Sequence, residues 1–100
     1  MLEIVDLAPQ QTTEERPHRI KLANWLQPGD SIASIDATTL TGIAQPAGKP
    51  DPLVEAGANI VFWLGGGTSG TTATGYHQFT TASGEVMRVN FQLSIADLPT

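Results

Sequence analysis

Strict alternation of apolar and polar side chains near the carboxyl end is the feature of this 100-residue chain that most constrains its fold. Between residues 85 and 95, every second position is apolar, and these positions are Met87, Val89, Phe91, Leu93 and Ile95. Because successive side chains of a β-strand point to opposite faces, this spacing places all five on one face. Residues 85–95 are therefore predicted to form a strand that covers a hydrophobic core.

Other segments also have strand character, and none has the sustained spacing of an amphipathic helix. The clearest is the continuous apolar run Asn59–Leu64, which is rich in β-branched and aromatic residues. A hairpin turn is expected at residues 82–84 and a single helical turn at residues 23–26. The remaining predicted strands are residues 18–22, 31–37 and 71–81. Short strands separated by turns predict an all-β domain, with an immunoglobulin-like antiparallel β-sandwich as the preferred architecture.

The predicted core comes mainly from the last three strands. Its members are expected to be Phe62, Trp63, Phe79, Val89, Phe91 and Leu93. The 31–37 strand is less regular, because ideal alternation would place Ile32 and Ile35 on opposite faces.

The amino-terminal residues 1–17 are predicted to form an extended arm before a sandwich domain of residues 18–100. The polar segment between Pro9 and Pro17 is typical of a linker. A short apolar segment precedes it, and its side chains are the candidate partner contacts: Leu2, Ile4, Val5 and Leu7. Such a segment could form an edge strand of the same domain or pair with a neighbouring chain.

The middle of the chain, residues 39–57, contains three prolines and predicts a long loop with one edge strand near residues 39–44. A loop of this length is often functional. Its proline-rich part, residues 46–52, could make contacts or cross between two sheets.

Composition argues against several function classes. Ten acidic and five basic residues give a net charge of −5, which disfavours nucleic-acid binding. The absence of cysteine excludes disulfides and thiolate metal sites. The first residues are acidic where a signal peptide would be basic, and no apolar run has the length of a membrane span. Secretion by the usual route and membrane insertion are not expected.

The sequence predicts no catalytic, metal-ligating or cofactor-binding residue. His18 and His77 have no second histidine at ligand spacing. The glycine-rich segment 65–72 lacks the lysine and the following helix of a phosphate-binding loop. No serine lies in a nucleophile-elbow context. The carboxylates with polar neighbours, expected to be solvated turn residues, are Asp30, Asp36, Asp51 and Glu55.

Trp25 is predicted to close one end of the sandwich. The alternative is that Trp25 and Tyr76 form an aromatic platform for sugar rings, as in carbohydrate-binding modules.

Three segments resemble small virion proteins of tailed bacteriophages. Trp25-Leu26 followed by Pro28–Ser34 resembles their opening segment, and Phe62–Thr72 is similar to a segment in their second half. Thr80–Glu85 resembles their hairpin. The resemblance covers residues 20–95 in the same order, and it departs from the family pattern at Ala73, where an aromatic residue is usual.

The resemblance identifies the chain as similar to phage fibre–tail adaptors, which are taken to have an immunoglobulin-like sandwich. It implies a non-enzymatic structural protein that acts in the tail or neck of the virion, in fibre–tail attachment, without a cofactor. The implied partners are other virion proteins, in a symmetric multimer assembled in the cytoplasm of the bacterial host. The alternatives are a capsid decoration (cement) protein and a carbohydrate-binding β-sandwich module.

Overall fold

The predicted carboxyl-terminal strand is present as β7 (Val86–Ile95), which pairs along its whole length with β6 (Thr71–Thr81). The computed structural model describes residues 4–97. Along β7, the side chains of Val89, Phe91, Leu93 and Ile95 are buried, and the residues between them are exposed or half-buried. Period-2 alternation therefore located both the strand and its core face.

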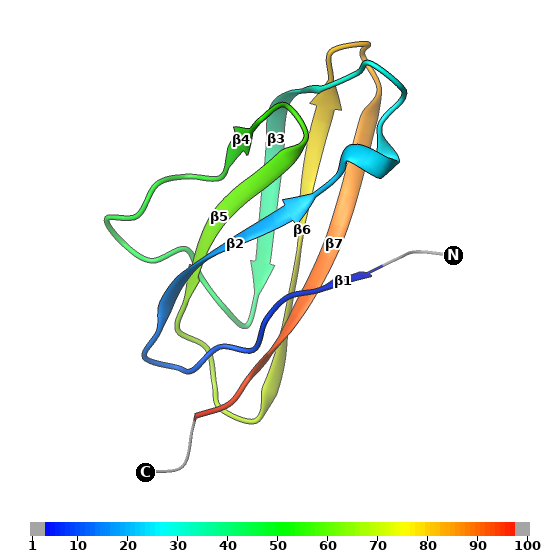
Figure 1. The fold of residues 1–100 in the computed structure, drawn as a ribbon. Coiled ribbons are helices and arrows are strands. Elements are labelled where there is room, and N and C mark those ends of the chain that lie inside the picture. Colours follow the sequence, from blue (N-terminus) through cyan, green and yellow to red (C-terminus); the bar gives the residue numbers. More distant parts are fainter. Residues whose placement is uncertain (1–3, 98–100) are drawn as a thin grey trace.

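Within residues 4–97, seven strands form two sheets that pack as a sandwich (Figure 1). The four-stranded sheet has the order β1-β7-β6-β3 and adds β1 (Ile4–Asp6) and β3 (Ile32–Thr41) to the β6–β7 pair. The three-stranded sheet has the order β2-β5-β4, with β2 (Glu15–Lys21), β5 (Asn59–Gly65) and β4 (Leu53–Glu55).

The strand order resembles that of an immunoglobulin-type sandwich. In chain order, β2-β5-β4 and β3-β6-β7 correspond to the B-E-D and C-F-G strands of that sandwich. The first strand is the exception, because β1 pairs with β7, in parallel, while the other strand pairs are antiparallel. A short 3-10 helix, η1 (Ala23–Trp25), connects the two sheets. Within residues 4–97, no helix is long and apolar enough to cross a membrane.

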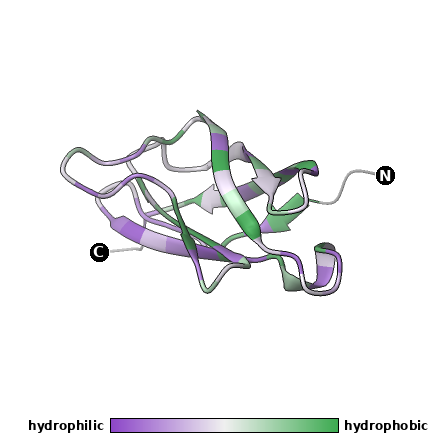
Figure 2. Cartoon of the chain, turned by 90° about the horizontal axis from the view of Figure 1, so that it is seen from above, coloured by the Kyte–Doolittle hydropathy of each residue, from purple (hydrophilic) through white to green (hydrophobic). Residues whose placement is uncertain are grey.

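The core lies between the sheets, and hydrophobic and hydrophilic residues alternate along the strands that enclose it (Figure 2). Its aromatic centre is formed by Phe62 and Phe91, whose ring centroids are 5.0 Å apart. The buried apolar residues around them are Ile20, Leu22, Ile32, Ile43, Ile60, Leu64, Ala73, Phe79, Val89, Leu93 and Ile95.

Trp63 departs from the expected core set. Phe62 and Leu64 point inward, so the alternation of β5 turns Trp63 to the outer face of the three-stranded sheet, where it is half-buried. The amino group of Lys49 lies 4.5 Å from the centre of the Trp63 ring. A continuous apolar run shows that a strand is well packed but does not show which of its residues face the core.

The expectation that Ile32 and Ile35 face opposite sides is wrong. Ile32 is buried, and Ile35 packs against the same core cluster. The pairing of β3 with β6 shifts by one residue between Ile32 and Ser34, so an extra residue separates the two isoleucines. This β-bulge changes the parity of the strand and returns Ile35 to the inner face.

The proline-rich loop connects the two sheets and lies beside β5. β3 extends to Thr41, beyond the predicted end of its strand, and Ala44 then forms an isolated antiparallel bridge with Gly65. Pro46 packs close to Gly65, where an added Cβ would lie 2.9 Å from the proline ring. The chain re-enters the three-stranded sheet at β4.

Candidate protein interface

The amino-terminal segment contributes to the sandwich from Ile4 onward. Val5 and Leu7 pack against the core cluster, while Ile4 is 52% exposed. Leu2, the fourth candidate contact residue, lies outside the described residues. Of the two possibilities for this segment, the structure shows pairing within the same chain, through the parallel contact of β1 with β7.

A buried glutamine anchors this segment to both sheets. The Gln10 backbone donates to the Ser94 carbonyl at 3.1 Å in the four-stranded sheet. Its side-chain Nε2 donates to the Leu64 carbonyl at 2.6 Å in the three-stranded sheet, and its Oε1 lies 2.9 Å from Nε2 of His18. Gln10 is only 1% exposed, and all of its side-chain polar atoms are paired. The sequence gives no sign of this role, because a glutamine between prolines is typical of a solvated linker.

The outer face of the four-stranded sheet carries few charges on β6 and β7. On β6 and β7, the residues between the buried ones point outward, and most of them are threonine, asparagine or glutamine. Arg88 is the one cation on these two strands, and its guanidinium lies 4.0 Å from the centre of the Tyr76 ring. At the β1 edge, Gln92 Nε2 donates to Asp6 Oδ1 at 2.7 Å.

A shallow hollow of about 290 Å³ crosses this outer face. It is lined by residues from all four strands: Ile4, Thr39, Thr41, Thr74, Gly75, Tyr76, Asn90 and Phe91. Gly75 is required beneath it, because an added Cβ would lie 2.6 Å from both the Phe91 ring and the Thr39 carbonyl oxygen. The glycine lets the Phe91 ring and β3 approach β6 closely, which fixes the shape of the hollow.

Two exposed apolar side chains lie on the same face. Ile4 pairs with Asn90 and Val86 pairs with Thr80, so both point outward with the hydroxyl and amide side chains. Val86 is 64% exposed. Uncharged polar groups combined with a Tyr–Arg stack and exposed aliphatic side chains are the chemistry of many protein–protein contact surfaces.

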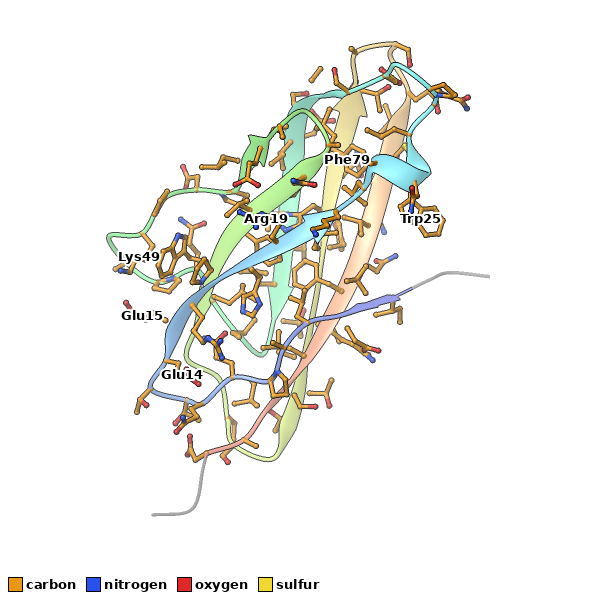
Figure 3. The ribbon with its side chains drawn as sticks, in the orientation of Figure 1. Glu14, Glu15, Arg19, Trp25, Lys49 and Phe79 are labelled. Atoms are coloured by element: carbon orange, nitrogen blue, oxygen red, sulfur yellow. The ribbon has the colours of Figure 1, made fainter. Side chains whose placement is uncertain are left out.

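Trp25 and Tyr76 do not form the aromatic platform considered from the sequence. Trp25 extends from η1 and is 53% exposed (Figure 3), whereas Tyr76 lies on β6 beneath Arg88. Among residues 4–97, no aromatic contact joins them. The structure also leaves Trp25 exposed rather than closing an end of the sandwich.

Both histidines lie beside the Phe62 ring, His18 from the three-stranded sheet and His77 from the four-stranded sheet. His77 is fully buried, and its ring centroid lies 4.4 Å from that of Phe62 in an edge-on contact. Its Nδ1 pairs with Thr38 Oγ1 at 2.8 Å, and its Nε2 has no hydrogen-bond partner among the residues that the structure describes. Burial lowers the pKa of His77 to about 4, and burial followed by the charge of Arg16 lowers the pKa of His18. Both side chains are therefore neutral core residues at neutral pH.

The carboxylates hold turns and strands together. Asp30 accepts hydrogen bonds from the backbone and hydroxyl of Ser83, which fastens the β6–β7 hairpin, and this lowers the pKa of Asp30. Hydrogen bonds from Thr80 and Ser34 lower the pKa of Asp36 in the same way. In the described part of the chain, no three histidine or acidic side chains gather in a way that could hold a metal ion.

Comparison with known families supports a role in assembly. The family model described as podophage GP4 fiber-tail adaptor protein gp77 matches residues 10–94. The match begins at Gln10, the residue that anchors the amino-terminal segment to both sheets. No curated protein matches the chain.

Proposed function

This chain belongs to the podophage fiber-tail adaptor family, and from that membership we propose that it is a non-enzymatic structural protein of a tailed phage virion. In this proposal it joins tail or neck components to fibres through protein–protein contacts. It acts in several symmetric copies within the particle, after assembly in the bacterial cytoplasm.

The observation that carries the proposal is the outer face of the four-stranded sheet. Burying an uncharged hydroxyl or amide side chain against a partner that replaces its hydrogen bonds is much less costly than burying a charge. This face offers such groups around a hollow of about 290 Å³, together with the exposed Ile4 and Val86. It is a surface that a neighbouring protein can cover.

Quantitative mass spectrometry of purified particles tests the proposed function. The copy number relative to the portal protein should be low and should follow the rotational symmetry of the tail. A copy number that follows the major capsid protein would instead indicate a decoration protein. Absence from the particles would contradict the proposal.

A charge placed in the hollow tests which face makes the contact. We expect Thr74→Lys to reduce incorporation into particles by about tenfold, because the lysine would be buried without a partner. Leu53→Lys is the matched control, since Leu53 is 45% exposed on the three-stranded sheet. Equal incorporation of both variants would show that the outer face of the four-stranded sheet is not the contact.

A further inference from the structure

The free edges of the two sheets are protected to very different degrees. The free edge of β2 carries Arg16, Pro17 and Arg19, and prolines and charged side chains are common protections against unwanted strand pairing. β1 and β4 are edges of only three residues each. The fourth edge is β3, which lies on the side of the four-stranded sheet opposite β1 (Figure 1).

Only the first half of β3 is protected. Two register shifts interrupt its pairing with β6 before Ala37, and Asp36 lies within that irregular part. From Ala37 to Thr41 the pairing is continuous, and the sequence Ala-Thr-Thr-Leu-Thr has no charge, proline or glycine. Four of these five residues are exposed. A regular, uncharged, β-prone edge of this kind is a template for another strand.

In residues 37–41, some backbone N–H and C=O groups point away from β6. Thr81 of β6 donates its N–H to the Glu85 carbonyl on the β7 side. The N–H and C=O groups of successive strand residues point to opposite sides, so those of the even-numbered β6 residues point toward β3. Two of these residues, Tyr76 and Thr74, lie opposite Thr39 and Thr41 of β3. The peptide groups of Thr38 and Leu40 therefore point to the open side. Among residues 4–97, β3 pairs only with β6.

A small acidic hollow adjoins the open edge. It has a volume of about 200 Å³ and is lined by Ile35–Thr38 together with Asp51 and Pro52 from the loop before β4. The ion pairs of residues 4–97 join Arg16 to Glu14 and Arg19 to Glu55, so neither Asp36 nor Asp51 has a cationic partner there. Asp36 accepts hydrogen bonds from Ser34 and Thr80, and Asp51 accepts one from Gln45, so the two carboxylates at this hollow are bonded only to uncharged groups.

We propose that residues 37–41 of β3 receive an extended segment of another virion protein, which adds a strand to the four-stranded sheet. The segment places a lysine or arginine side chain in the hollow beside Asp36 and Asp51. Main-chain hydrogen bonds would supply affinity and the acidic hollow specificity, as in other cases of strand addition. This inference rests on the proposed function, since it names the kind of partner that the adaptor holds.

Charge distinguishes this partner from a second copy of the chain. Residues 32–41 contain no basic residue, so pairing of β3 with β3 of another copy would leave both acidic hollows without a cation. It would also bring additional carboxylates to the same edge. A basic extended segment satisfies both the open backbone groups and the two carboxylates.

Hydrogen exchange of the chain within purified particles tests the inference directly. We expect the peptide that contains Thr38 and Leu40 to exchange about tenfold more slowly in the particle than in the free chain, because its outward amides become hydrogen-bonded. A chain that is present in particles but unprotected at these residues overturns the inference and leaves the adaptor function standing. A chain that is absent from particles contradicts the adaptor function itself.

A pair of substitutions at one position isolates the backbone contribution. Thr38→Pro removes an outward donor, which edge strands tolerate, and it also removes the hydroxyl that pairs with His77. Thr38→Val loses the hydroxyl but keeps the donor, so it is the matched control. We expect Thr38→Pro to be incorporated into particles about tenfold less than Thr38→Val. Equal incorporation of two folded variants would contradict strand addition at this edge.

A peptide titration tests the charge preference and does not depend on the folding of the proline variant. The probes are short peptides of alternating threonine and valine with one central lysine, or with glutamate in its place. The lysine peptide should bind about tenfold more tightly, shift the amide resonances of residues 37–41, and lose most of this preference in Asp51→Asn. Equal binding of the two peptides, binding elsewhere, or dimerisation through β3 would overturn the inference.

Discussion

The outer faces of the two sheets differ in the charged side chains that they carry. Arg19 and Lys49 lie on the side of the three-stranded sheet (Figure 3), where Arg19 pairs with Glu55 at 2.7 Å and the Lys49 amino group lies 4.5 Å from the centre of the Trp63 ring. On the four-stranded sheet, threonine, asparagine and glutamine side chains surround a hollow, and the only cation on β6 and β7 is stacked on Tyr76.

This difference separates a face that remains in water from one that a partner can cover. Charged groups lose several kcal/mol of hydration on burial unless they are well paired, whereas hydroxyl and amide groups need only new hydrogen bonds. The aromatic side chains show the same contrast. Trp63 is covered by the chain's own loop, while Tyr76 lies in the wall of the hollow.

The largest expected effect distinguishes the two faces of a single strand. Phe62→Ala should lower the free energy of unfolding by about 3–5 kcal/mol, because Phe62 fills the centre of the core. Trp63→Ala should lower it by only about 1–2 kcal/mol, since Trp63 is half-buried on the outer face. Urea denaturation measures both. Equal losses would mean that the outer face of the three-stranded sheet is as tightly packed as the core.

The next effect compares the buried histidine of each sheet. Between pH 6.5 and 4, the unfolded chain binds a proton that the folded His77 does not, so the free energy of unfolding falls as the pH falls. The loss should be on the order of 3 kcal/mol and complete near pH 4. His18 acts in the same direction and has Gln10 as a partner for its ring.

Denaturation of the wild type and of His77→Phe, at pH 7.5 and at pH 4.5, separates the two histidines. His77→Phe should remove most of the loss between these pH values, because phenylalanine does not ionise. A wild type with the same stability at both pH values would contradict the buried neutral state of His77.

Substitution of Gln10, which bonds to both sheets, should have an intermediate effect on the free energy of unfolding. Gln10→Ala should lower the free energy of unfolding by about 2 kcal/mol, because it removes the donor to the Leu64 carbonyl and the partner of His18 in a buried position. Gln11→Ala is the control, since Gln11 bonds to Glu14 through its backbone N–H and its side chain makes no hydrogen bond within residues 4–97. Thermal melting that shifts equally in both variants would argue against Gln10 as an anchor.

The smallest effect is expected on the charged face. The side chains of Arg19 and Glu55 are 51% and 40% exposed, so water and salt screen their ion pair. Arg19→Ala should cost less than about 1 kcal/mol at low salt and almost nothing in high salt. A larger loss that persists in high salt would indicate that this face is more than a solvated surface.

The sequence by itself located the five longer strands and one core face, but not β4 or the pairing of β1. Alternation with period 2 depends only on neighbouring residues, so it located β7 from Val86 to Ile95, and turn residues marked the hairpin before it. The family resemblance depends on the order of such segments, and the family match over residues 10–94 agrees with it.

Only the tertiary structure decided which faces and edges are open. Contacts between segments distant in sequence decide on which face of its sheet Trp63 lies, that Gln10 is buried and that His77 pairs with Thr38. The parity of Ile32 and Ile35 depends on a bulge that is defined by the register against β6. A strand's own residues fix its alternation, but its neighbours decide whether its backbone is already paired, which is why the open edge at residues 37–41 became visible only in the folded sheet.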